Sequence, residues 1–480
     1  MKQKLLGLID QAKKLGVSYS DIRFIRDEYE RIAVKNDQID EVSGGESEGI
    51  GIRVLIDGAW GFYATNQMDE EGMNQCLEKA YKIAKNGGKI SEINVEIEEI
   101  PPQNGTYSTA FEIDPFTVSK EKKIQLLLEC TKIMMTVEGV KISKGSLISV
   151  KEHRCFASTD GTYVVQNIIK TGGGIQAMAI RGDDVQMRSY PAAFDGDFSA
   201  SGWEFIENID LIANSLKTAQ EAVALLEAEE CPHDVMDLIL GSSHLALQIH
   251  ESLGHPAELD RVLGHEISLA GGSFLTTDKV DNFKYGSEHV TINSDPTLYG
   301  GMGSYGWDDE GVPAKRAKLV DKGLFVNYLS SRESAPLINK KSTGAMRVTT
   351  FNRPPIIRMT NVNLEPGNWT LEDLIKDTKK GIYMETTKSW SIDELRLNFQ
   401  FGCQIGWLIE DGCITKMIKN PLYSGTTPEF WNNCDAIVNK DRWRLWGIMN
   451  CGKGEPMQSA HVGHGCSLAR FKNVQIGVEK

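Results

Sequence analysis

The stretch VMDLILGSSHLALQIHESLGH, residues 235–255, decides how the second half of this chain is organised. Val235 to Leu240 is an apolar run typical of a buried strand. Gly241-Ser242-Ser243 follows as a turn whose serine can cap a helix. Leu245 to Leu253 then repeats apolar residues at helical spacing. The sequence therefore predicts a strand, a tight turn and a helix that ends among histidines.

The end of this predicted helix, His250-Glu251-Ser252-Leu253-Gly254-His255, resembles the H-E-x-x-H zinc motif with one more residue between the histidines. On a straight helix residues advance by roughly 100° each, so i and i+4 share a face whereas i and i+5 diverge by about 140°. Gly254 is a poor helix former, and Pro256 disfavours helical backbone at His255. We therefore expect the helix to end before His255, with the two histidines projecting from the last turn and from the chain beyond it.

Two imidazoles placed in this way can bind a metal ion. Glu251, beside the first histidine, can then take a proton from a water bound to that metal. Zinc also needs a third protein ligand, which these six residues do not supply. Ordinary surface or core histidines in a chance arrangement are the competing interpretation, and the motif alone does not decide between the two.

The segments before residue 227 alternate between helical and strand-like patterns. The periodicity predicts helices over 2–15, 73–84, 118–136 and 204–229 and strands over 21–65 and 145–190. Turns are expected at Gly44-Gly45, Asp57-Gly58, Asp160-Gly161 and Gly182-Asp183, and a loop at Pro101-Pro102 and Asn104-Gly105.

The predicted fold class is α+β. Residues 1–230 form an amino-terminal domain of helices and antiparallel meanders, which can be divided into two repeated units of about 1–100 and 110–230. Beyond Glu227–Pro232 short strand candidates dominate, so residues 231–480 are expected to form a β-rich carboxy-terminal domain that carries the metal motif.

Composition excludes several classes of protein. Hydrophobic residues make up 41% of the 480 residues and charged residues 25%, as in ordinary globular proteins. The formal net charge of −14 disfavours nucleic acid and anionic membranes as partners, and no uncharged apolar run approaches the roughly 18 residues of a membrane span. The nine cysteines include no C-x-x-C pair, so reduced thiols and a cytoplasmic location are expected.

The residues after the second histidine extend the motif to H-E-x-x-G-H-x-x-E-x-D over 250–260, with Glu258 and Asp260 as the added acids. This pattern resembles the TldD branch of the TldD/PmbA family of bacterial and archaeal metalloproteases. Further blocks that resemble the family are Ser20-Asp21-Ile22-Arg23, Gly49-Ile50-Gly51-Ile52-Arg53 with Gly58, Trp60, Gly61 and Phe62, Asp308-Asp309-Glu310-Gly311-Val312-Pro313, Arg358-Met359-Thr360-Asn361 and Cys451-Gly452-Lys453-Gly454.

The resemblance implies one zinc ion per chain, held by His250, His255 and Cys451, with Glu251 as the general base. A thiolate binds zinc strongly, and two neutral imidazoles with one thiolate leave a fourth position open for water. The resemblance also implies short or unfolded peptides as substrates. It further implies a toroidal or clam-like dimer, formed with a second copy or with a TldE/PmbA-like sister subunit.

Several neighbouring residues have more than one interpretation. Glu258 and Asp260 either fix the tautomers of the ligand histidines or form an exposed acidic turn. The cluster His461-Val462-Gly463-His464-Gly465-Cys466 can supply the third ligand or a separate metal site, and we favour His464 as a substrate or oxyanion contact. Asp308, Asp309 and Glu310 lack the spacing of a calcium loop and are expected to form a solvated turn.

The sequence thus predicts a zinc-dependent peptidase in which Glu251 activates a metal-bound water. The alternative is a non-catalytic partner subunit of the same family, or a peptide-binding regulator that acts as an indirect modulator of DNA gyrase. The acidic composition makes direct action on DNA unexpected.

Overall fold

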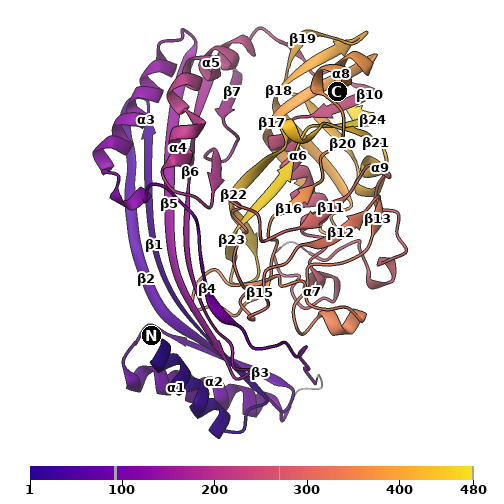
Figure 1. The fold of residues 1–480 in the computed structure, drawn as a ribbon. Helices are drawn as coiled ribbons and strands as arrows, with labels where there is room; N and C mark the ends of the chain where they lie inside the picture. Colours follow the sequence, from indigo (N-terminus) through magenta and orange to yellow (C-terminus); the bar gives the residue numbers. More distant parts are fainter. Residues whose placement is uncertain (91–93, 270, 478–480) are drawn as a thin grey trace.

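The computed structural model describes residues 1–90, 94–269 and 271–477, and it confirms the α+β class. Figure 1 shows a long, curved amino-terminal sheet that stands beside a β-rich carboxy-terminal region. The chain passes from the first sheet to the second between residues 224 and 229. We retain the division at 230/231 as a proposed domain boundary.

The amino-terminal sheet has the strand order β3-β2-β1-β5-β6-β4, with β7 and β8 paired to β6. Its strands are β1 (Tyr19–Lys35), β2 (Gln38–Ile56), β3 (Ala59–Thr65), β4 (Asn104–Ser108), β5 (Val140–Ser158), β6 (Tyr163–Arg181), β7 (Asp184–Tyr190) and β8 (Asp197–Ser199). Helix–meander–helix order occurs twice along this part of the chain, and the pairing of β1 with β5 joins the two meanders into one sheet.

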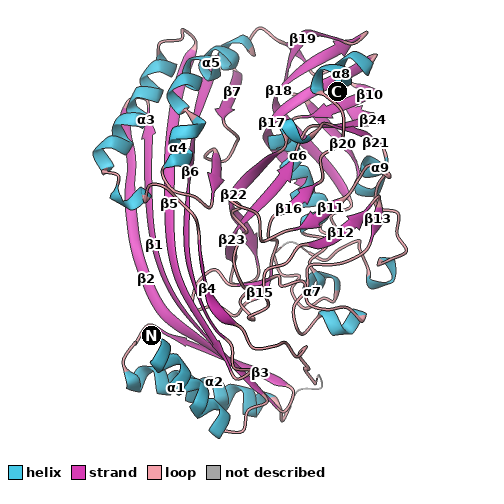
Figure 2. Ribbon diagram, in the orientation of Figure 1, coloured by secondary structure: helices cyan, strands magenta, loops and turns pink. Residues whose placement is uncertain are grey.

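Helices cover the two ends of this sheet (Figure 2). They are α1 (Lys2–Lys14), α2 (Glu70–Gly87), α3 (Lys120–Met135), α4 (Glu204–Ile209) and α5 (Leu211–Ala224). One helix was predicted over 204–229, but the chain breaks at Asp210, which has a φ of 45° and whose carboxylate caps α5 by accepting from Ala213 N at 3.1 Å. The cap and the left-handed backbone start a new helix there.

Two predicted turn or loop positions are instead strand residues. Gly44-Gly45 lies inside β2, and a Cβ on Gly45 would lie 2.9 Å from Tyr29 Cε1. Asn104-Gly105 begins β4, and a Cβ on Gly105 would lie 2.6 Å from the Trp307 ring. In both cases glycine permits close packing rather than a turn.

The main carboxy-terminal sheet has the order β17-β10-β24-β20-β18-β19-β9, with β21 on β24, and a further β17–β18 pairing closes part of it into a ring. Its strands are β9 (Glu229–Glu230), β10 (Asp234–Leu240), β17 (Lys380–Ile392), β18 (Asn398–Glu410), β19 (Cys413–Lys419), β20 (Leu422–Thr426), β21 (Cys434–Ile437) and β24 (Ala469–Ile476). Short strands form smaller sheets: β11 (Ile292–Ser294), β12 (Ala317–Asp321), β13 (Leu324–Phe325) and β16 (Val362–Leu364); β14 (Met346–Arg347) and β15 (Ile356–Ile357); β22 (Arg444–Lys453) and β23 (Gln458–Cys466).

Among the carboxy-terminal helices, α6 (Ser242–Ile249) lies at the centre of the domain core, and α7 (Leu259–Val262), α8 (Leu371–Asp377) and α9 (Thr427–Asn432) are short. The predicted strand, turn and helix are all present, but the expected serine cap is wrong. Gly241 is the N-cap and no side chain caps the helix. A Cβ on Gly241 would lie 2.8 Å from Glu385 Cγ. Within the described residues no helix is long and apolar enough to cross a membrane.

Buried charges join the two regions near one end of the long sheet, where β1 begins and β2 ends. Arg53 on β2 lies 2.6 Å from Asp21 on β1 and 3.4 Å from Glu310 of the carboxy-terminal region. The prediction of a solvated turn at 308–310 is therefore wrong: Asp308 and Glu310 are buried. Asp308 accepts hydrogen bonds from the backbone of Glu310, Val312 and Met346, and these bonds replace the water it has lost.

Replacing Arg53 by methionine should destabilise the protein by about 3–5 kcal/mol, because the buried carboxylate of Glu310 would lose its ion-pair partner and that of Asp21 would keep only Arg23, at 3.2 Å. Urea unfolding would measure the change. Arg26→Met is the matched control, since Arg26 and its partner Glu46 are exposed and surface pairs contribute little. Equal losses of unfolding free energy in the two variants would contradict the assignment of Arg53 as the cation of a buried charge cluster.

His244 should make the fold acid-sensitive. It is fully buried between Thr387 and Tyr423, and burial lowers its pKa to about 3. Below a pH of about 6.5 the unfolded chain therefore binds a proton that the folded chain does not, so stability falls by about 1.4 kcal/mol per pH unit until the folded form also titrates. His244→Gln should show a shallower fall in unfolding free energy on acidification, whereas the surface substitution His289→Gln should match the wild type.

Candidate metal centre

The histidines of the extended motif are brought together by a π-helical turn over His250–Gly254. The backbone N–H of His255 donates to the carbonyl of His250 at 3.1 Å, an i→i+5 bond. His255 has φ −66° and ψ −47°, so the prediction that it leaves the helical region is wrong. The wider turn places i and i+5 on one face, with ring centroids 4.8 Å apart. Packing favours glycine at position 254, since a Cβ there would lie 2.1 Å from Met359 Sδ and the methionine side chain would have to move.

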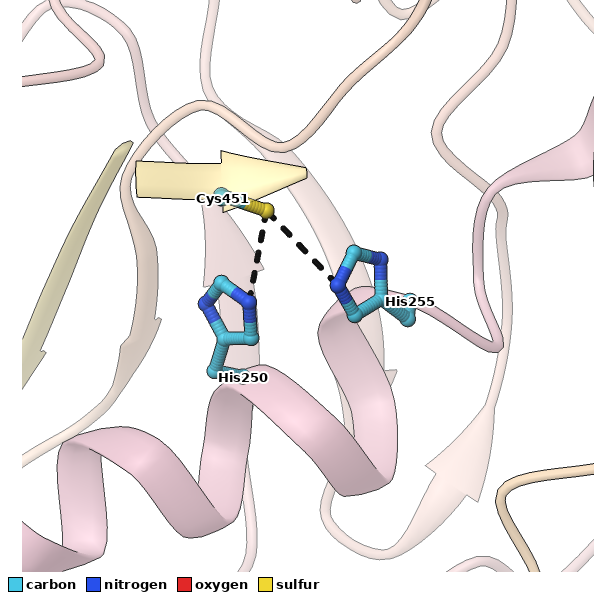
Figure 3. A group of neighbouring side chains, drawn as sticks. All are labelled: His250, His255 and Cys451. Carbon is cyan, nitrogen blue, oxygen red and sulfur yellow. Dashed lines mark hydrogen bonds between the residues drawn. The ribbon is translucent and has the colours of Figure 1, made fainter. Parts of the chain in front are cut away.

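Cys451 reaches these histidines from strand β22 (Figure 3). Its Sγ lies 3.3 Å from His250 Nε2 and 3.6 Å from His255 Nε2. The three possible ligand atoms lie within 4.8 Å of one another, and all three residues are buried. Cys451 therefore forms one cluster with two histidines that lie 196 and 201 positions before it in the sequence.

The donor set fits a zinc ion. Zn–N bonds of about 2.1 Å and Zn–S bonds of about 2.3 Å at a tetrahedral angle separate nitrogen from sulfur by about 3.6 Å. The sulfur–nitrogen distance to His255, 3.6 Å, equals that value, and the distance to His250, 3.3 Å, is 0.3 Å shorter. Three ligands from the chain would leave one position of a tetrahedron open.

His255 is oriented by Glu258. The carboxylate Oε2 of Glu258 accepts from His255 Nδ1 at 3.0 Å, so Nε2 keeps its lone pair toward Cys451. Glu258 is fully buried, and although burial alone raises the pKa of its carboxyl, Lys453 and His255 hold that pKa well below its ordinary value.

His250 is oriented by a second imidazole, that of His464. His464 Nδ1 donates to the backbone oxygen of Val362 at 3.1 Å, and its Nε2 lies 2.8 Å from His250 Nδ1. Burial lowers the pKa of His250 to about 4 and that of His464 well below its ordinary value, so both rings are neutral at pH 7. The carbonyl can only accept, so Nδ1 of His464 must hold its proton. His250 Nδ1 must then donate, which leaves His250 Nε2 free to bind a metal.

The Cys451 thiol differs from other buried cysteines of the chain. Burial raises the pKa of Cys403, Cys434 and Cys466. At Cys451 burial acts in the same direction, but His255 and Arg358 outweigh it and the pKa is lowered. The site thus favours a thiolate, the form that binds metal.

Basic residues surround the acids that follow the motif. Lys453 Nζ donates to Asp260 Oδ1 at 2.6 Å, and Arg261 Nε donates to Glu258 Oε2 at 2.9 Å. Arg358 donates to the backbone oxygen of Cys451. The interpretation of Glu258 and Asp260 as an exposed acidic turn is therefore wrong, because both are buried in this network.

The histidines of the carboxy-terminal cluster point to opposite sides of strand β23. His464 faces His250, whereas His461 lies 3.0 Å from Lys170 Nζ of the amino-terminal sheet. Cys466 Sγ donates to Ser242 O. In the described part of the chain, His250, His255 and Cys451 are the one group of three side chains arranged to hold a metal. Both nitrogens of His464 are engaged, so its geometry favours a role behind His250 over the expected contact with substrate.

Glu251 is paired with a residue that sequence reasoning missed. Arg396 Nη1 lies 2.5 Å from Glu251 Oε2, and both residues are buried. Arg396 lies in the turn between β17 and β18, 145 positions from Glu251, where no motif or periodicity distinguishes it.

A cavity of about 600 Å³ lies between the long sheet and strand β22. Its lining includes Arg31, Ile148 and Gln176 of the sheet together with Met449 and Asn450. A smaller pocket shares Met449 and Asn450 and extends to helix α6. Both therefore lie beside the residues that immediately precede Cys451.

Comparison with known proteins supports the predicted family resemblance and the fold. Models of the PmbA/TldA metallopeptidase family match three stretches: domain 1 over 20–84, the central domain over 113–228 and the C-terminal domain over 233–478. A metalloprotease of Methanocaldococcus jannaschii is 32% identical over 97% of this chain and 98% of its own. A zinc metalloprotease TldD homologue of Saccharolobus solfataricus is 25% identical over 98% of each chain.

A solved structure has the same fold at low sequence identity. TldE from Thermococcus kodakarensis superposes with a TM-score of 0.72 at 18% identity, covering 99% of this chain and 100% of that one.

His464→Phe should weaken zinc affinity by about 10–100-fold, because His250 Nδ1 loses the acceptor that fixes its tautomer. Competition with a chromophoric chelator would measure the affinity. His461→Phe is the matched control, since His461 lies on the other face of the same strand and should leave the affinity unchanged. An equal loss in both variants, or none in His464→Phe, would refute this arrangement.

Proposed function

The chain belongs to the PmbA/TldA metallopeptidase family, and on that basis we propose that it is a zinc-dependent peptidase with one zinc ion per chain. The observation that carries the proposal is a buried cluster of two neutral imidazoles, both oriented by hydrogen bonds, and one thiol whose pKa is lowered. A relative over the full length bears the name zinc metalloprotease. His250, His255 and Cys451 would hold the metal.

When bound, zinc would act as a Lewis acid that polarises a peptide carbonyl and acidifies a water molecule. We assign to Glu251 the role of taking the proton from the attacking water and returning it to the leaving amine. Glu258 and His464 keep the two histidines in the tautomer that exposes Nε2. Arg358 fixes the backbone at Cys451.

The substrates we propose are short or unfolded peptides. The cavity of about 600 Å³ beside Met449 and Asn450 can accept an extended segment of chain but not a folded domain. Burial of all three proposed ligands likewise requires a narrow segment of substrate to enter.

The protein is proposed to act as a dimer, either with a second copy or with a TldE-like sister subunit. A solved structure with the same fold is named TldE. The alternative of a non-catalytic subunit or indirect gyrase modulator has less support. A subunit without catalytic activity would not require an oriented His–His–Cys cluster with a neighbouring carboxylate.

Metal analysis of the purified protein tests this proposal. We expect about one zinc per chain in the wild type and in Glu251→Gln, but a large loss in Cys451→Ser, because only the last removes a ligand. Cys434→Ser, which alters another buried cysteine, should retain zinc. Cleavage of unfolded peptides should require zinc and should be abolished in Glu251→Gln.

Retention of zinc by Cys451→Ser would show that the ligand set is wrong. Zinc-loaded wild-type protein that cleaves no peptide would refute the catalytic assignment.

A further inference from the structure

The turn between β17 and β18 presents a buried arginine to the proposed general base. Arg396 is 7% exposed although it lies in a connection between strands, and its φ is 64°. Left-handed backbone at a residue other than glycine is strained and persists only where the surroundings hold it. The surroundings therefore hold the turn in a conformation that directs the Arg396 side chain inward.

Hydrogen bonds fix the turn on both sides of Arg396. The carboxylate of Asp393 accepts from the backbone N–H groups of Leu397 at 2.8 Å and Asn398 at 3.0 Å. Arg396 N donates to Asp393 O at 2.9 Å, and Arg396 O accepts from Thr427 Oγ1 at 2.8 Å. The position of the guanidinium thus depends on a rigid loop rather than on a flexible one.

The guanidinium holds one particular oxygen of Glu251. Arg396 Nη1 lies 2.5 Å from Oε2. Over residues 1–90, 94–269 and 271–477, no hydrogen bond to Glu251 Oε1 is found. One carboxylate oxygen is therefore anchored and the other is available to accept a proton.

We propose that Arg396 is a positioning residue for peptide hydrolysis: it holds Glu251 by Oε2 so that Oε1 faces the attacking water. This inference rests on the proposed peptidase function. A general base must lie within hydrogen-bond reach of the proton it removes, and Glu251 is the second residue of the π-helical turn that aligns the two histidines. A partner from another element is needed to fix the rotamer of its side chain.

Steady-state kinetics of Arg396 variants, with zinc content measured for each, tests the proposal. Arg396→Met should lower kcat by about 10²-fold and change KM by less than about threefold, because the base is misplaced while substrate binding is retained. Arg396→Lys, which keeps the charge but offers a different donor geometry, should lose about tenfold in kcat. Arg396→Ala should regain part of its kcat when methylguanidinium is added.

Rescue separates positioning from a purely structural role, because a loop that has lost its shape is not restored by a small cation. Arg188→Met is the matched control: Arg188 is equally buried and pairs with Glu221 at 2.8 Å, outside the centre. It should leave kcat unchanged. The double variant Glu251→Gln/Arg396→Met removes both charges and should fold and bind zinc, which tests whether the turn survives without its ion pair.

The outcomes distinguish the inference from the function on which it rests. An active wild type with an equally active Arg396→Met overturns the inference alone, as does a change confined to KM or a loss of kcat without rescue. A zinc-loaded wild type that cleaves no peptide overturns the proposed function and the inference together.

Discussion

The backbone N–H of His255 donates to the carbonyl of His250, and this i→i+5 bond decides which side chains share a face of the central helix. In a regular α-helix the two rings would diverge, and Cys451 could meet only one of them. The wider turn aligns both imidazoles and leaves Glu251 beside the first. Met359 packs so closely against Gly254 that a Cβ there would displace its side chain, and this contact joins the turn to the segment that also carries Arg358.

The two histidines are oriented by chemically different partners, and the difference matters for the charge of the site. His255 donates to a carboxylate, and His250 donates to an imidazole whose own proton is held by a backbone carbonyl. Both arrangements expose Nε2, but only one adds a negative charge. A second carboxylate would have added another buried anion that needed its own cation.

Much of the fold could be predicted because periodicity reports which faces are buried. The helices at 2–14 and 70–87, the long meanders and the strand–turn–helix before His250 all follow from local patterns. Predictions that depended on glycine failed where glycine serves close packing, as at Gly45, Gly105 and Gly254. Such packing involves residues that are remote in sequence, so no local pattern reveals it.

The site could be predicted only in part, for a related reason. The motif and the family resemblance named His250, His255 and Cys451, but the π-helical turn that unites them is a tertiary effect. Asp308 and Glu310 were expected in solvent because a run of acids is normally hydrated, but their partners lie at remote positions. Glu310 pairs with Arg53 of the amino-terminal sheet and accepts from the Arg332 backbone, and Asp308 accepts from the Met346 backbone. Arg396 carries no local sign of its role because its partner lies on a different element.

The charge balance around the centre explains why a cysteine, and not a third histidine, suits this position. Arg261, Arg358 and Lys453 outnumber Glu258 and Asp260 among the buried groups, and Glu251 is already paired with Arg396. One uncompensated positive charge therefore remains in a medium of low dielectric, where charges interact strongly. A thiolate at Cys451 neutralises it, in agreement with the lowered pKa of that thiol. A neutral imidazole at this position would carry no negative charge, so the uncompensated positive charge would remain. That charge would repel the divalent cation that the site has to bind.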